Sequence, residues 1–239
     1  MEKFFCKIDS KVINDLNKQI SNNRILNWAP DYNNQAGISF DNLSYILDYW
    51  KNQFSWTKEE AKLNKFNQYL LEYDNITTHF LHIKSDQKNS IPLLLIHGWP
   101  GSIFEFNDLI PLLTNPEKDN LKDHQAFDLI IPSLPNVGFS FSPQQKPLDL
   151  TEIAKHFIKL MQTLGYQKYF IQGGDLGSFV ASIMAVNVPN RVMGIHLNLL
   201  PLPRGLNKKP DNSEEESYYE DLRYFMKYET GYQQIQGTK

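Results

Sequence analysis

The run GGDLGS at residues 173–178 could carry covalent chemistry. It follows an apolar stretch typical of a buried strand and precedes a helical pattern, so Asp175 is predicted to stand at a sharp strand-to-helix turn. A carboxylate held there can attack a carbon atom and form an ester, which water hydrolyses in a second step. Glycines fit such a turn because Cβ atoms would collide with the neighbouring strand and helix. The alternative is an ordinary glycine-rich turn in which Asp175 caps the helix.

A second motif favours the catalytic interpretation. The run HGWPGS at residues 97–102 directly follows an apolar run at 92–96. In the nucleophile elbow of α/β hydrolases, the amide after the nucleophile and an amide from a loop after an earlier strand form an oxyanion hole. The two donors are predicted here to be the backbone N–H groups of Leu176 and Trp99. Two such motifs, each after its own strand, indicate an α/β-hydrolase site with aspartate as the nucleophile.

The histidines do not complete this site. His97 precedes the nucleophile, so we expect it to support the oxyanion loop together with Gly98 and Pro100. In α/β hydrolases the order along the chain is nucleophile, acid, histidine. After Asp175 the sequence contains one histidine, His196, inside an apolar strand, and we expect a core residue rather than the base. Several acidic residues further on are expected to be solvated: Glu214, Glu215, Glu216 and Glu220.

Together with LPNVGFSFSP at residues 134–143, both motifs resemble the microsomal-type epoxide hydrolases, which include the juvenile-hormone epoxide hydrolases. The helical leader with Trp28 and Trp50 resembles the N-terminal region of that family. Residues 231–239 resemble the start of its lid. One departure is Leu176, where many members have tryptophan, although only the backbone N–H is required there.

This resemblance implies hydration of a small apolar epoxide to a diol, without a metal or another cofactor. Asp175 would form the alkyl ester, and Tyr232 of the lid would donate a proton to the departing oxygen. Haloalkane dehalogenases also use an aspartate, but they place a halide-binding tryptophan after it, which Leu176 cannot replace. A third interpretation belongs to another class of function: an inactive remnant or binding module that keeps the pocket.

The elements from residue 77 onward predict a doubly wound α/β sheet. Short apolar runs, of the kind that parallel sheets bury on both faces, alternate with helical patterns. The predicted strands are 78–83, 92–96, 127–131, 169–171 and 192–197. The predicted helices are 103–113, 150–164, 178–188 and a last one capped by Ser213 with Glu216 and ended by Gly231.

The first 75 residues are predicted to form helices and loops. Asp9 or Ser10 can cap a first helix, and an apolar stripe at residues 43–50 indicates a second. Thr57 and Glu60 have the spacing of a capping box, which predicts a third helix reaching residue 70.

The composition is that of a soluble globular protein. Of 239 residues, 41% are hydrophobic and 13% aromatic, enough for a core. The 24 basic and 27 acidic residues are not segregated, which argues against binding to nucleic acid. The single cysteine, Cys6, excludes a disulfide framework. Apolar runs long enough for a membrane span or a signal peptide are absent, so a cytoplasmic location is expected.

These observations predict three regions and an unfinished fold. We expect a helical epoxide-hydrolase N-terminal region (1–75), a partial α/β-hydrolase core truncated after about the sixth strand position (76–203), and the start of the lid (204–239). Because acid and base are missing, we predict the N-terminal half of a longer enzyme, with negligible turnover alone. The strand at 192–199 would leave an open sheet edge, so the partners expected besides the epoxide are a downstream fragment or a second copy.

Overall fold

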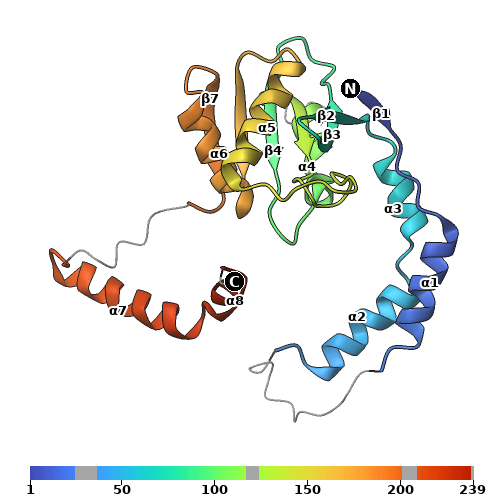
Figure 1. Ribbon diagram of the computed structural model, residues 1–239, viewed down its shortest axis with the longest axis horizontal. Coiled ribbons are helices and arrows are strands. Elements are labelled where there is room, and N and C mark those ends of the chain that lie inside the picture. Colours follow the sequence, from blue (N-terminus) through green and yellow to red (C-terminus); the bar gives the residue numbers. More distant parts are fainter. Residues whose placement is uncertain (25–36, 117–123, 201–208, 238–239) are drawn as a thin grey trace. The chain divides into compact units, whose positions relative to one another are not determined.

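A computed structural model of the chain describes residues 1–24, 37–116, 124–200 and 209–237 (Figure 1). The chain divides into two compact units, residues 1–200 and residues 201–239, which are described separately below. Trp28 lies outside the described residues. In the part of the chain that the structure describes, no helix is long and apolar enough to cross a membrane.

The first unit is built on a mixed sheet of seven described strands, in the spatial order β1-β2-β3-β5-β4-β6-β7. The pairs from β1 to β5 are antiparallel, and those from β5 through β4 and β6 to β7 are parallel. The strands are β1 (Glu2–Phe4), β2 (Gln68–Tyr73), β3 (Ile76–Ile83), β4 (Ile91–Ile96), β5 (Phe127–Pro132), β6 (Tyr169–Gly173) and β7 (Val192–Leu197). The predicted α/β fold is confirmed, with an antiparallel extension that the sequence did not indicate.

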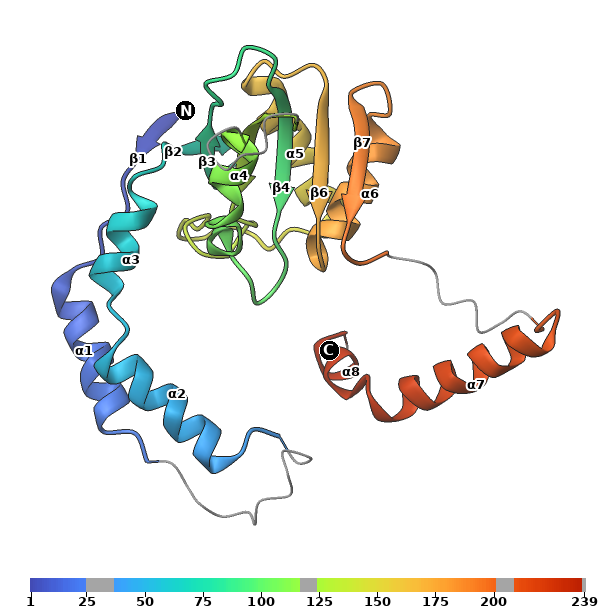
Figure 2. The same cartoon turned by 180° about the vertical axis from the view of Figure 1, so that it is seen from behind.

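Helices cover the two faces of this sheet unequally. On one face lie α5 (Leu150–Thr163) and α6 (Leu176–Asn187), and on the other lie the 3-10 helix η1 (Ile103–Phe106) and α4 (Leu109–Thr114) (Figure 2). Side chains alternate between two cores: Leu94 and Ile96 of β4 pack with α5 and α6, whereas Leu93 and Leu95 pack with η1 and α4. The single helix predicted at 103–113 is therefore wrong in detail, because it is interrupted before Leu109.

The leader contains α1 (Ser10–Ser21), α2 (Phe40–Asn52) and α3 (Trp56–Leu63). The Asp9 side chain accepts a hydrogen bond from the Lys11 amide, which confirms Asp9 as the N-cap of α1. The capping box predicted from Thr57 and Glu60 is wrong, since the N-cap of α3 is Ser55. The Glu60 carboxylate instead accepts hydrogen bonds from the Ile8 amide at 2.8 Å and the Trp56 indole at 3.0 Å.

Two strands replace the helix-and-loop structure expected at both ends of the leader. Residues 68–73 form β2, so α3 does not reach residue 70. The chain between β1 and α1 is fixed by Asn64, whose side chain bonds both the amide and the carbonyl of Cys6, at 2.9 and 2.7 Å. Cys6 is fully buried, and this burial raises the pKa of its thiol to about 11.

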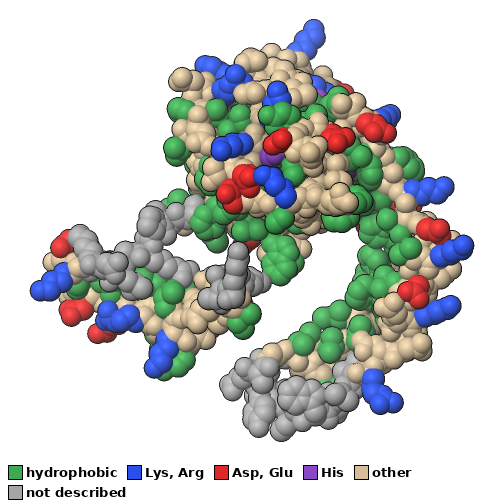
Figure 3. Space-filling model, in the orientation of Figure 1, with side chains coloured by type: hydrophobic (Ala, Val, Ile, Leu, Met, Phe, Trp, Pro, Cys, Tyr) green, Lys and Arg blue, Asp and Glu red, His purple; other side chains and the backbone are tan. Residues whose placement is uncertain are grey.

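Apolar side chains remain exposed along α1 and α2. In Figure 3 the charged side chains of these helices gather on one side and the hydrophobic ones on the opposite side. The exposed fraction is 59% for Val12, 48% for Ile46 and 40% for Trp50. The predicted apolar stripes therefore exist, but they are only partly covered within the first unit.

Two buried polar clusters brace the sheet. His79 of β3 is fully buried, and its ring bonds Ser133 Oγ at 3.0 Å and Gln68 Oε1 at 3.1 Å. Burial lowers the pKa of His79 to about 4, so its ring is neutral. At the start of β5, the Asp128 carboxylate binds Lys84 Nζ at 2.7 Å and also accepts bonds from Ser85 and Ser90.

The second unit consists of α7 (Ser213–Tyr228) and α8 (Gly231–Gly237). The N-cap of α7 is Asn212, whose side chain accepts from the Glu215 amide, and not Ser213 as predicted. Gly231 begins α8 instead of ending α7.

Candidate active site

Asp175 directly precedes α6, in the two-residue turn that it forms with Gly174 after the end of β6. Its backbone has φ +49° and ψ −124°, a conformation that residues other than glycine rarely adopt. Such a conformation costs about 1–3 kcal/mol and persists where the surrounding structure enforces it, often at functional sites. The geometry is therefore that of the strained elbow expected from the sequence.

Two glycines make this turn possible. A Cβ atom on Gly173 would lie 2.2 Å from the Gly177 carbonyl oxygen, and one on Gly177 would lie 2.3 Å from the Ile96 carbonyl oxygen. At Gly174 the nearest atom would be Asn198 Nδ2 at 3.4 Å, which is ordinary contact. The close packing inferred from the sequence thus holds at 173 and 177 but not at 174.

The loop after β4 meets the carboxylate. β4 and β6 are adjacent parallel strands, so their carboxyl ends lie at the same edge of the sheet. The Trp99 amide donates a hydrogen bond of 2.9 Å to Asp175 Oδ1, across 76 residues of sequence. Gly98 permits this approach, because its Cβ would lie 2.4 Å from Asp175 Cβ. Leu176, as the first residue of α6, has an N–H without an intrahelical partner, and the positive end of the helix dipole favours an anion there.

Hydrogen bonds of the His97 ring hold the loop that follows β4 in place. The ring is 1% exposed and lies between the Gly98 carbonyl, 2.7 Å from Nδ1, and the Leu134 amide, which donates to Nε2 at 3.0 Å. Because Nε2 accepts a bond, the ring proton lies on Nδ1 and is donated to Gly98. Burial lowers the pKa of His97, which keeps the ring in this neutral form. The peptide bond before Pro100 is cis.

At its C-terminal end the same loop is held by a capping box. Ser102 caps η1, and the Glu105 carboxylate accepts a bond from the Ser102 amide at 3.1 Å. A Cβ on Gly101 would overlap that carboxylate, so glycine leaves room for it.

The segment at 134–143 supports the site through hydrogen bonds. Asn136 and Gly138 have positive φ angles, and the Asn136 amide bonds the Ser140 carbonyl at 2.8 Å, which closes a tight loop after β5. The buried Ser140 hydroxyl donates to the Ser133 carbonyl at 2.8 Å. Through Leu134 this loop sets the position of His97.

Two further residues singled out in the sequence lie in other elements, His196 in β7 and Tyr232 in α8. His196 lies in β7 as predicted, but the expectation of a core position is wrong, because its side chain is exposed. Tyr232 belongs to the second unit; its side chain is 60% exposed and its hydroxyl accepts a bond from Gln233 at 2.8 Å. Across the residues that the structure describes, no group of three or more His, Cys, Asp or Glu is placed to hold a metal ion.

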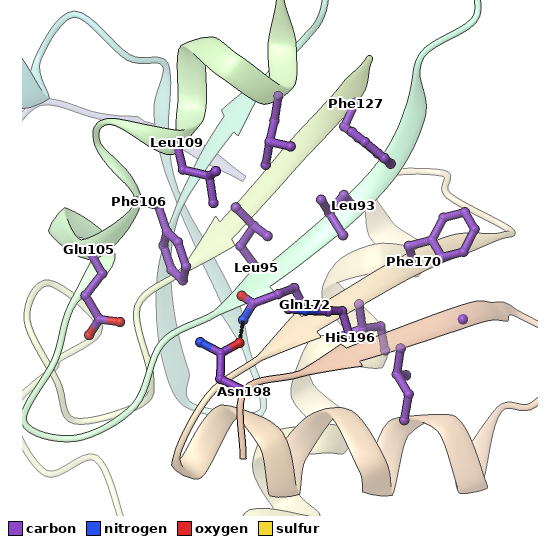
Figure 4. A pocket seen from close by; sticks show the side chains of 14 residues that line it. Leu93, Leu95, Glu105, Phe106, Leu109, Phe127, Phe170, Gln172, His196 and Asn198 are labelled. Atoms are coloured by element: carbon purple, nitrogen blue, oxygen red, sulfur yellow. Dashed lines mark hydrogen bonds between the residues drawn. The ribbon is translucent and has the colours of Figure 1, made fainter. Parts of the chain in front are cut away.

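Sequence reasoning missed two polar residues beside the elbow. Gln172 Nε2 donates to Asn198 Oδ1 at 2.9 Å, and the backbone N–H of Asn198 donates to the Gly173 carbonyl at 3.2 Å. Both side chains border an apolar groove of about 700 Å³ on the α4 face of the sheet (Figure 4). A polar residue within an otherwise apolar strand, as at 172, is the signal that could have revealed them.

Comparison with known proteins identifies two family models along the chain. Residues 1–106 match the model described as epoxide hydrolase N terminus, and residues 91–227 match the alpha/beta hydrolase fold. Epoxide hydrolase 1 of Sus scrofa is 34% identical over 255 aligned positions, which cover 99% of this chain and 56% of that protein. The chain spans about half the length of the curated relatives it matches.

Solved structures give the same result. The epoxide hydrolase of Aspergillus niger has a TM-score of 0.78 at 29% identity, covering 97% of this chain and 61% of that one. The juvenile hormone epoxide hydrolase of the silkworm Bombyx mori has a TM-score of 0.73 at 32% identity, covering 83% and 52%.

Proposed function

The chain belongs to the epoxide hydrolase family of the α/β-hydrolase fold, and on that premise we propose that Asp175 opens an epoxide by forming an alkyl ester. The observation that carries the proposal is the hydrogen bond from the Trp99 amide to Asp175 Oδ1. It ties one carboxylate oxygen and leaves Oδ2, which has no hydrogen-bond partner among the described residues, to attack the ring carbon. The carbon–oxygen bond of the ring then breaks, and the departing oxygen takes up a proton.

The same amide serves the second step. Water adds to the ester carbon of Asp175, and negative charge develops on Oδ1. The N–H groups of Trp99 and Leu176 stabilise that charge as an oxyanion hole, and collapse of the intermediate releases the diol. His97, Gly98 and Pro100 act by holding the Trp99 amide in place.

The proton for the departing oxygen is assigned to Tyr232, as the family resemblance implies. In this proposal residues 204–239 form the start of the lid segment of the family, residues 76–203 form the hydrolase core, and residues 1–75 form the N-terminal region. The substrate class is a small apolar epoxide. A cytoplasmic location is also part of the proposal, supported by a single cysteine that offers no disulfide within the chain.

Hydrolysis of the ester requires a base that these residues do not supply at the elbow. The one histidine after Asp175 is His196, within β7. We therefore propose that the 239-residue chain alone is alkylated slowly and turns over negligibly, because loss of acid–base help alone costs about 10²–10⁴-fold. A polypeptide that adds the acid and the histidine, pairing along the open edge of β7, would restore turnover.

Mass spectrometry after incubation with styrene oxide tests the nucleophile. We expect one adduct per chain, on a peptide that contains Asp175, and none in Asp175→Asn, because an amide is a poor nucleophile. Glu72→Gln, which removes an exposed carboxylate of β2, is the matched control and should be alkylated like the wild type. Adducts spread over surface carboxylates with Asp175 unmodified would refute the assignment and favour the interpretation as a binding module.

A further inference from the structure

The imidazole of His79 in β3 is held by hydrogen bonds at both nitrogens and by two aromatic rings. Nδ1 lies 3.0 Å from Ser133 Oγ, and Nε2 lies 3.1 Å from Gln68 Oε1. The rings of Phe4 and Phe139 meet the imidazole in edge-to-face geometry, with centroid distances of 4.9 and 5.1 Å. Because the ring is fully buried among these neighbours, its orientation is fixed, and it can set the position of the groups that it contacts.

Neighbouring hydrogen bonds determine which nitrogen of His79 carries the proton. The side-chain NH₂ group of Gln68 donates to the Leu63 carbonyl at 3.2 Å and to Asn64 Oδ1 at 3.0 Å. Gln68 Oε1 is therefore the acceptor that faces His79, and the ring donates to it from Nε2. Nδ1 is left without a proton, so it accepts a hydrogen bond from the Ser133 hydroxyl.

The backbone of His79 also holds the chain that leaves β5. Its carbonyl accepts a bond of 2.9 Å from the Ser133 amide, and its amide donates to Ser140 Oγ at 2.9 Å. The Ser140 hydroxyl in turn donates to the Ser133 carbonyl at 2.8 Å. The amide, carbonyl and hydroxyl of Ser133 are thus each bonded to His79 or to a residue that His79 holds, which fixes the peptide bond between Ser133 and Leu134.

That peptide bond begins a path of hydrogen bonds that ends at the nucleophile. The Leu134 amide donates to His97 Nε2 at 3.0 Å, and His97 Nδ1 donates to the Gly98 carbonyl at 2.7 Å. Gly98 and Trp99 share the peptide bond whose N–H donates to Asp175 Oδ1 at 2.9 Å. Since each donor points along the path toward Asp175, each bond polarises the next. A change at the start of the path is therefore transmitted to the amide that holds the carboxylate.

We propose that His79 is a positioning residue for the reaction of Asp175. Its Nδ1 holds Ser133, and through His97 that bond fixes the direction of the Trp99 N–H. The direction of this N–H sets how the free carboxylate oxygen faces the substrate. Misplacement of a reacting group by about 1 Å can slow a reaction about 10²-fold, so the loss of a distant hydrogen bond can be measured in the rate. The inference rests on the proposed function, because it assigns a role in alkylation of the same carboxylate.

Two amide substitutions of His79 separate the roles of its ring nitrogens. The amide group of asparagine reaches the position of Nδ1, so His79→Asn can still accept from Ser133 but loses the bond to Gln68. The amide group of glutamine reaches the position of Nε2, so His79→Gln keeps the bond to Gln68 but loses the bond to Ser133. Each variant loses one buried hydrogen bond, so a merely structural role of His79 predicts the same result for both.

The rate of alkylation by styrene oxide, followed by mass spectrometry on the full 239-residue chain without denaturant, tests the proposal. We expect His79→Gln to slow alkylation of Asp175 at least about tenfold and His79→Asn to stay within about threefold of the wild type. Asp128→Asn, at the other end of β5, is the control. It removes the ion pair with Lys84 but leaves the path intact, so its rate should equal that of the wild type. Equal rates in the two variants of His79 would overturn the proposal.

A further variant and a second measurement keep the test decisive if a variant of His79 does not fold or if the carboxylate does not react. Ser133→Ala removes the hydroxyl that bonds Nδ1 with little change in volume, and it should slow alkylation like His79→Gln. In nitrogen–proton correlation NMR, the amide proton of Trp99 should move upfield in Ser133→Ala and His79→Gln, because its bond to Asp175 lengthens, and should not move in His79→Asn. If this pattern is seen but wild-type Asp175 is not alkylated, the proposed function fails and the positioning role stands. If the wild type is alkylated and the Trp99 signal is the same in all of these chains, the positioning role is wrong.

Discussion

Replacing Gly177 by alanine tests whether the elbow is as tightly packed as its geometry requires. Helix propensity alone favours alanine at this position in α6 by about 1 kcal/mol. Steric contact opposes it, because the new Cβ would lie 2.3 Å from the Ile96 carbonyl oxygen, when ordinary contact begins at 3.4 Å. Backbone must therefore move by about 1 Å, and such overpacking typically costs about 1–3 kcal/mol.

We expect Gly177→Ala to lose about 2 kcal/mol in the free energy of unfolding, measured by urea titration followed by circular dichroism. For a chain of this size that loss lowers the midpoint of thermal unfolding by about 4–8 °C. Gly174→Ala is the matched control, since its Cβ would meet the Asn198 side chain at ordinary contact distances, the nearest atom being Nδ2 at 3.4 Å. Its stability should stay within about 0.5 kcal/mol of the wild type. A Gly177→Ala variant as stable as the wild type, or two equal losses, would refute the close approach of α6 to β4.

Three other predictions follow from buried or crowded side chains. The pKa of His79 is lowered to about 4, below the value in the unfolded chain, so lowering the pH favours the unfolded state. Urea titrations should show full stability above pH 6.5 and a loss of about 3 kcal/mol in the free energy of unfolding between pH 6.5 and 4. His79→Gln should flatten this dependence, and a flat wild-type profile would contradict it. Asp128→Asn should cost about 1–3 kcal/mol in thermal unfolding, since it removes the charge that pairs with Lys84, and an unchanged midpoint would count against this role. Gly98→Ala should slow alkylation of Asp175 by about 10²-fold in the mass-spectrometric assay, because its Cβ displaces the carboxylate; an unchanged rate would show that the Trp99 loop adapts.

The elbow and its partner loop could be predicted because their signals are local. Gly173 and Gly177 indicate a turn in which the backbone leaves no room for a Cβ atom. The amide that follows the nucleophile is identified directly from the sequence, because it belongs to the next residue. β4 was recognisable from a continuous apolar run, and β5 from an apolar run in which Asp128 is the one polar residue. Those features depend on neighbours along the chain.

What the sequence could not show depends on distant partners. Gln68 is polar, yet it is buried in β2 because His79, on the neighbouring strand, bonds its side chain. Phe66 and Leu70 have helical spacing, but pairing with β1 and β3 makes residues 68–73 a strand. His196 sits among apolar residues, yet it is exposed because β7 is the last described strand of the sheet and one of its faces is uncovered. Residues adjacent in sequence do not indicate which distant strands pair with a segment or which face of a sheet stays uncovered.

The anchoring of Cys6 by Asn64 has a consequence for any electrophile that reaches this protein. Thiolates are ordinarily the side chains that react fastest with strained ethers and maleimides, but a buried thiol with a pKa of about 11 is almost entirely protonated at neutral pH. A reactive ring can therefore meet the carboxylate at the elbow without being consumed by sulfur. We expect the same thiol to report local opening, because a maleimide should label it only when the segment around Cys6 separates from Asn64 and exposes the sulfur.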